Sequence, residues 1–174
     1  EGGYSASLSA DDLQSAPRIE NRGETPVSTS VTVSGVPVVA PPAEASGYEI
    51  TRRYYTLEGE EADPDAIAQG DRLVAVVEVQ PVDKAFARLM IDDPLPAGFA
   101  IDNPAILQGG DVGALDFLEL TGEAAHTEFR SDRFLVAVDK PEGSTTQMRF
   151  AYIVRALSPG EFVHPAASVE DMYR

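Results

Sequence analysis

The 174-residue chain contains no cysteine and no tryptophan, only two histidines, and thirteen lysines and arginines. The lack of cysteine excludes disulfides, thiol nucleophiles and thiolate metal sites. Twenty-nine aspartates and glutamates give a formal net charge of −16. Such a charge repels phosphate backbones and anionic lipids, so we predict neither nucleic-acid binding nor direct membrane contact. An aromatic content of 7% is low for a platform that binds carbohydrate or an apolar ligand.

Long apolar runs are also missing. The run from Leu73 to Val77 is among the longest, and a membrane-spanning helix needs about 20 apolar residues. The chain begins at Glu1 without an initiator methionine or the pattern of a signal peptide, so we expect it to be part of a longer polypeptide.

Short runs of β-branched and aromatic residues alternate with turn residues, and no stretch has a convincing amphipathic helical period. This pattern predicts an all-β, antiparallel β-sandwich. The runs from 73 to 79 and from 148 to 157 are apolar at most positions, which is typical of central strands. The other predicted strands are 4–8, 26–33, 48–57, 86–91 and a hairpin over 127–139.

Three connecting segments predict a domain boundary, a cap on the sheets and a turn between two strands. Residues 35–47 contain three prolines and one charge, which indicates a linker and divides the chain into domains 1–40 and 47–174. Residues 92–99 are rich in turn formers and are expected to cap one end of the sheets. After the turn at Ser158-Pro159-Gly160, residues 161–164 are expected to pair back beside the strand 148–157.

The remaining connections carry weaker signals. One helical turn is expected at 65–68, and residues 103–122 are irregular, with 115–120 as a second candidate for a turn of helix. The strand pattern also predicts which side chains are buried across two packed sheets. They are Val74, Val76, Phe134, Val136, Tyr152 and Val154.

The residues that could carry chemistry do not form a recognisable motif. His126 and His164 lie on different predicted elements without a nucleophile motif beside either, so we expect two surface histidines and no catalytic residue. The aspartates lack the spacing of a calcium loop, so solvated loops are expected, with no metal and no cofactor. The aspartates in question are Asp63, Asp65, Asp92, Asp93, Asp102, Asp111 and Asp116. Glu58, Glu60 and Glu61 are likewise expected to form a solvated acidic rim.

A pair of arginines, Arg52 and Arg53, stands before Tyr54 and Tyr55, a combination that could stack on nucleic bases. On a strand, successive side chains point to opposite faces, so these four residues do not form one platform. We expect the arginines to pair with carboxylates instead.

Five phrases, taken in order, resemble the C-terminal region of bacterial alpha-2-macroglobulins: YEITRRYYTLEG, QGDRLVAVVEV, DDPLPAGFAIDNP, DRFLVAVD and YIVRALSPGEFVHPAASVEDMYR. The match is to the last macroglobulin-like domain of that family, a fibronectin III-like β-sandwich that follows the thioester-bearing helical domain. Residues 19–37 are similar to the end of the penultimate sandwich domain. The resemblance therefore implies that strands of an incomplete second sandwich domain precede the main one.

The resemblance implies a function as well. The whole protein would be a periplasmic, broad-range protease inhibitor, lipid-anchored at the inner membrane in many family members, that cages a target protease after its bait region is cleaved. This chain would be a structural part and not an enzyme, and it lacks the reactive thioester because it has no cysteine. Its partners would be the thioester domain and neighbouring macroglobulin-like domains.

The resemblance also singles out Met172 and Tyr173, at the place where the family's final domain faces the thioester domain, as an interdomain contact that shields the thioester. The alternative is that the pair packs on its own sandwich. Two other functions stay open: a stand-alone adhesive or carbohydrate-binding sandwich module, and a calcium-dependent accessory domain of an enzyme. The macroglobulin hypothesis requires a thioester-type helical domain encoded immediately upstream, whereas the adhesive module predicts tandem sandwich repeats. The parent reading frame would therefore distinguish them.

Overall fold

The computed structural model describes residues 5–9, 11–12, 18–32, 34, 42–102 and 118–173. The chain divides into two compact units, Glu1–Pro42 and Ala43–Arg174, and each is described by itself. In the first unit, the described side chains are all exposed and none of the described residues lies in a strand.

The strands predicted at 4–8 and 26–33 are therefore not formed in the described part of this unit, which leaves out Tyr4 and Val33. A strand is stabilised by a paired neighbour and a buried face. The described residues here form no strand pair and bury no face, since even Val27 and Val31, at alternate positions of the second predicted strand, are both exposed. The assignment of residues 1–40 to a penultimate sandwich domain stays a prediction.

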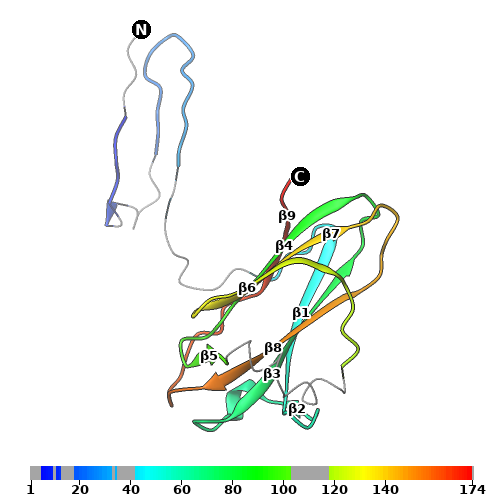
Figure 1. Ribbon diagram of the computed structural model, residues 1–174. Helices are drawn as coiled ribbons and strands as arrows, with labels where there is room; N and C mark the ends of the chain where they lie inside the picture. Colours follow the sequence, from blue (N-terminus) through cyan, green and yellow to red (C-terminus); the bar gives the residue numbers. More distant parts are fainter. Residues whose placement is uncertain are drawn as a thin grey trace. The chain divides into compact units, whose positions relative to one another are not determined.

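The second unit is a sandwich of two antiparallel sheets, which confirms the predicted fold (Figure 1). One sheet has the order β2-β1-β3-β8-β5 and the other has the order β6-β7-β4-β9. The strands in its described part are β1 (Tyr48–Tyr55), β2 (Glu61–Ala62), β3 (Arg72–Pro81), β4 (Ala87–Pro94), β5 (Phe99–Ile101), β6 (Ala124–Phe129), β7 (Arg133–Lys140), β8 (Met148–Ala156) and β9 (Ser168–Asp171).

Strands β3 and β8 are central, as their apolar sequences predicted. They pair with each other from Arg72 opposite Arg155 to Val79 opposite Met148, and β1 and β5 flank them. The predicted hairpin is also confirmed, with β6 and β7 joined around residues 130–132 and a bulge near His126. A 3-10 turn at Pro64–Ala66 occupies part of the expected helical turn.

The main core lies between the two sheets and contains four of the six side chains predicted to be buried: Phe134, Val136, Tyr152 and Val154. Val74 and Val76 are buried too, but they pack with Ile153 in a separate cluster. Side chains alternate across a strand, so β3 sends Leu73, Ala75, Val77 and Val79 into the main core and sends Val74 and Val76 to the other face of its sheet.

Two predictions about connections were wrong. Strand β4 continues through Asp92 and Asp93 to Pro94, where a turn was expected. Residues 161–164 do not form a strand beside β8, because β5 already occupies that edge, with Phe99 opposite Ala156. The chain instead runs over residues 157–167, here called the strap, to β9, which pairs with β4 in the other sheet.

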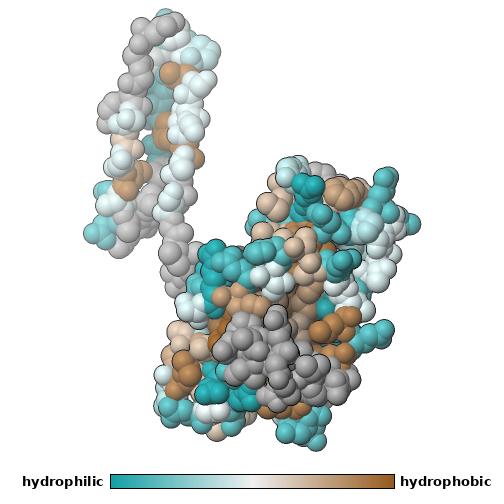
Figure 2. All heavy atoms as spheres, in the orientation of Figure 1, coloured by the Kyte–Doolittle hydropathy of each residue, from teal (hydrophilic) through white to brown (hydrophobic). Residues whose placement is uncertain are grey.

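Residues 103–117, with Asp111, Asp116 and the first half of the second predicted helical turn, lie outside the described residues. No helix in the described part of the chain is long and apolar enough to cross a membrane. Figure 2 shows hydrophilic residues over much of the visible face of the sandwich, in keeping with the acidic composition.

Candidate functional site

The C-terminal segment that follows β9 presents two large side chains at the surface. Met172 is 57% exposed and Tyr173 is 71% exposed. The edge strand β9 pairs with β4 from Asp92 opposite Ser168 to Leu89 opposite Asp171, and the Met172 amide donates to the Arg88 carbonyl at 2.9 Å. The sheet thus fixes the backbone of Met172 while its thioether side chain remains accessible.

Tyr173 is held next to this edge by two contacts. Its amide donates to the Asp171 carboxylate at 3.1 Å, and the guanidinium carbon of Arg88 lies 5.8 Å from the centre of its ring. A guanidinium at this distance is attracted to the face of an aromatic ring. The tyrosine therefore extends the exposed apolar surface of Met172 instead of filling the core of its own sandwich.

The strap that leads to β9 is anchored by Arg52 on β1. Its guanidinium donates to the carbonyls of Pro94 at 3.2 Å and Pro165 at 2.7 Å, and it pairs with the Asp93 carboxylate. One side chain therefore connects the first sheet, the end of β4 in the second sheet, and the strap.

Asp93 is the fully buried partner in this network. Tyr152 on β8 donates its hydroxyl to the second oxygen of Asp93 at 2.7 Å, and its ring stacks on Phe134 with centroids 4.4 Å apart. Burial raises the pKa of Asp93, while the charge of Arg52 and the Tyr152 hydrogen bond act against that rise. A buried carboxylate needs such partners, since an unpaired one would strongly destabilise the fold.

His164 fastens a second point of the strap. Its Nε2 atom lies 3.0 Å from the Tyr54 hydroxyl, and the two rings are 5.6 Å apart. Burial, with a smaller effect of the Arg52 charge, lowers the pKa of His164 to about 4. The imidazole is therefore neutral near pH 7. Burial also raises the pKa of Tyr54, so its hydroxyl stays protonated.

The structure does not bring the two histidines into one site. His126 on β6 and His164 on the strap are both exposed, as expected, although one side of the His164 ring is covered by Tyr54. The predicted acidic rim of Glu58, Glu60 and Glu61 is exposed as expected, and so is Asp63. Asp102 accepts hydrogen bonds from two arginines, Arg72 at 2.7 Å and Arg155 at 3.4 Å. Within the described ranges, no three histidines, aspartates or glutamates gather as metal ligands would.

The arginine and tyrosine pairs on β1 point to alternate faces, as predicted. Arg52 and Tyr54 face the core side, and Arg52 pairs with a carboxylate as expected. Sequence reasoning missed Asp93, which was assigned to a solvated turn. The available signal was the alternation Ala87, Leu89, Ile91, Asp93, which places this aspartate on the inward face of β4.

The model of the bacterial alpha-2-macroglobulin MG10 domain matches residues 47–174. The chain is 33% identical over 97% of its length to an alpha-2-macroglobulin of Xylella fastidiosa and 28% identical over 99% to one of Escherichia coli, and it spans about a tenth of each. Eighty percent of it superposes on the E. coli protein solved from domain MG7 to the C-terminus, with a TM-score of 0.69 and 27% identity, covering 22% of that chain. A Salmonella alpha-2-macroglobulin mutant, Y1175G, gives a TM-score of 0.68 at 26% identity over 80% of this chain and 9% of its own.

The two packed sheets thus define a macroglobulin-like sandwich domain. The chain belongs to the bacterial alpha-2-macroglobulin family, with the MG10 domain as its second unit.

Proposed function

We propose that this chain is the structural, non-catalytic C-terminal part of a protease-trapping alpha-2-macroglobulin, and that it packs on the thioester domain of the same polypeptide. Met172 and Tyr173 make that contact and keep water from the thioester. The observation that carries the proposal is the exposure of both side chains at 57% and 71% on a backbone fixed by the β4–β9 ladder.

The chemistry of the two side chains suits this role. Methionine adapts to irregular apolar surfaces, and an exposed apolar patch on a rigid edge is typical of a contact surface. Full burial of a methionine side chain in such a contact would stabilise the contact by roughly 1.5–3 kcal/mol. The alternative, in which the pair plugs its own sandwich, would require both side chains to be buried within this domain.

The related structures support the wider proposal. The E. coli protein was solved after activation by porcine elastase and by trypsin, and the Salmonella protein was solved after reaction with methylamine. Proteases and a primary amine are the reagents expected for a trap with a bait region and a thioester. We further propose a periplasmic location for the whole protein, with a lipid anchor at the inner membrane as in many family members; both rest on the resemblance alone.

The test uses the full-length protein that contains this chain. Met172→Ala and Tyr173→Ala should each speed the reaction of the thioester with methylamine, measured as the release of free thiol. Val163→Ala is the matched control, because Val163 is 83% exposed but belongs to the strap and not to the segment after β9. An unchanged thioester lifetime together with a lowered melting temperature would identify Met172 as a packing residue of its own domain.

A further inference from the structure

The end of the sandwich opposite Met172 and Tyr173 contains a pocket of about 500 Å³. Tyr173 lies beside Arg88 at the start of β4, whereas the pocket is lined by residues 96–99 that follow the end of β4. The other walls come from residues 64–69 and from the start of the strap. This site is therefore separate from the contact proposed above.

Hydrogen bonds between the three walls hold the pocket open. The Leu157 amide donates to the Gly98 carbonyl at 2.8 Å, and the Gln69 side chain donates to the Leu157 carbonyl at 2.8 Å. Phe162 lies directly against Gly98, where even an added methyl carbon would come within 2.5 Å of its ring. Because these walls are fixed before anything binds, the pocket loses little conformational freedom on binding.

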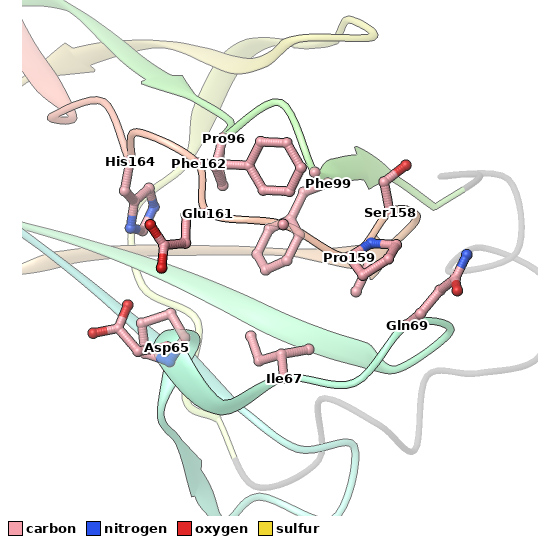
Figure 3. A pocket seen from close by; sticks show the side chains of 14 residues that line it. Asp65, Ile67, Gln69, Pro96, Phe99, Ser158, Pro159, Glu161, Phe162 and His164 are labelled. Atoms are coloured by element: carbon pink, nitrogen blue, oxygen red, sulfur yellow. The ribbon is translucent and has the colours of Figure 1, made fainter.

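The two ends of the pocket differ in chemistry (Figure 3). Ile67, Phe99 and Pro159 provide apolar walls, while the carboxylates of Asp65 and Glu161 lie toward the end where His164 sits. Among the described residues that line the pocket, none is a lysine or an arginine. The strap adds apolar surface beside it, since Leu157 is 49% exposed and Phe162 is 42% exposed.

We propose that this pocket docks a polypeptide segment that presents an arginine or lysine side chain. The aliphatic stem would lie along Ile67 and Phe99, and the cationic head would lie between Asp65 and Glu161. Long basic side chains place an apolar stem and a charged head in this way, and hydrogen bonds between charged groups are stronger than neutral ones. An anionic side chain would be repelled, and a purely apolar one would gain nothing from the two exposed carboxylates.

His164 supports this choice of occupant. Its ring nitrogen is engaged by Tyr54 and its pKa is lowered by burial, so it adds no positive charge to the acidic end near pH 7. The other charged groups near it are Asp65, which favours its protonation, Arg52, which opposes it, and Glu161, whose carboxylate lies toward the same end of the pocket. A protonated His164 would repel a bound cation, so docking should weaken at acidic pH.

The test is a titration of the isotope-labelled chain with the peptide acetyl-Val-Arg-Val-amide, followed by NMR. Amide shifts should move at Ile67, Phe99 and Phe162. The same peptide with citrulline, which has the shape of arginine without its charge, should bind about five- to tenfold more weakly. Raising the salt from about 0.05 to about 0.5 M should weaken the arginine peptide but not the citrulline peptide.

The double variant Asp65→Asn/Glu161→Gln should bind the arginine peptide only as weakly as the wild-type chain binds the citrulline peptide. The variant Glu58→Gln/Glu60→Gln removes the same charge from an exposed loop outside the pocket and should leave the affinity unchanged. Equal affinities for the arginine and citrulline peptides would overturn the proposal. Equal losses of affinity for the arginine peptide in the two double variants would also overturn it, as would the absence of amide shift changes at Ile67, Phe99 and Phe162. None of these outcomes depends on a thioester, so the result is independent of the role proposed for Met172.

Discussion

Replacing Asp93 with asparagine removes one charge of the ion pair that connects the two sheets and the strap. The substitution leaves the Arg52 guanidinium, whose side chain is only 11% exposed, without its carboxylate. Breaking a buried ion pair by removing one partner typically costs about 3–5 kcal/mol. A domain of this size has a free energy of unfolding of about 5–15 kcal/mol, so the loss should be large.

The assay is urea denaturation at neutral pH of the wild-type chain and of four variants: Asp93→Asn, Arg52→Met, the double variant of these two, and Asp92→Asn. Asp92→Asn is the control, because Asp92 is the next residue on β4, faces the opposite way, and pairs with the more accessible Arg133 at 2.9 Å. It should cost no more than about 1 kcal/mol. The double variant Arg52→Met/Asp93→Asn should cost less than the sum of the two single substitutions, by up to about 3 kcal/mol.

The same substitutions should loosen the strap, because Arg52 also donates to the Pro165 carbonyl. In Arg52→Met, hydrogen exchange of the Met172 amide should therefore accelerate more than exchange in the centre of β3. If Asp93→Asn costs less than about 1 kcal/mol, which is the usual size of a surface substitution, the account of this network is wrong.

Three further outcomes are expected. Tyr152→Ala should lower the free energy of unfolding by about 3–5 kcal/mol, since the tyrosine ring is fully buried against Phe134. Tyr152→Phe should lower it by about 1–3 kcal/mol, since an oxygen of Asp93 loses its hydrogen bond. A loss below about 1 kcal/mol for the alanine variant would place β8 at the surface. Gly98→Ala should displace Phe162 and raise the fluorescence of an apolar dye. Gly143→Ala meets no neighbouring atom but strains a turn at φ +81°, so it should lower stability while leaving the Phe162 resonance in place; an unmoved Phe162 resonance in Gly98→Ala would contradict the packing described. Because the pKa of His164 falls from 6.5 to about 4 on folding, its contribution to stability is complete above pH 6.5 and is lost as the pH falls toward 4. The melting temperature of the wild-type chain should therefore fall more steeply over that range than the melting temperature of His164→Gln; equal slopes in the wild type and the variant would refute this assignment.

The sandwich could be predicted from the sequence because the strands that dominate it satisfy local rules. β3 and β8 are apolar along most of their length, and β7 alternates cleanly with Phe134, Val136 and Val138 inward. These patterns depend on neighbours in the sequence, so they can be recognised without knowledge of the partner strands.

The errors arose where long-range partners decide the structure. Asp93 lies between an aspartate and a proline, a typical turn sequence, but Arg52 is available 41 residues earlier to neutralise it inside the sandwich. Residues 161–164 have strand-like side chains, yet β5 already fills the edge of β8 and the strap is instead anchored by side chains on β1. Neither partner is visible in the local sequence.

Oxidation of Met172 by hydrogen peroxide is the most direct test of the proposed contact. The chain has three methionines, and Met148, at 6% exposed, provides an internal standard for a buried one. In the isolated chain, Met172 should form its sulfoxide much faster than Met148, because its thioether is accessible. In the native full-length protein, Met172 should be as protected as Met148 if the proposed contact with the thioester domain covers it. Equal rates of Met172 oxidation in the isolated chain and in the full-length protein would contradict the account.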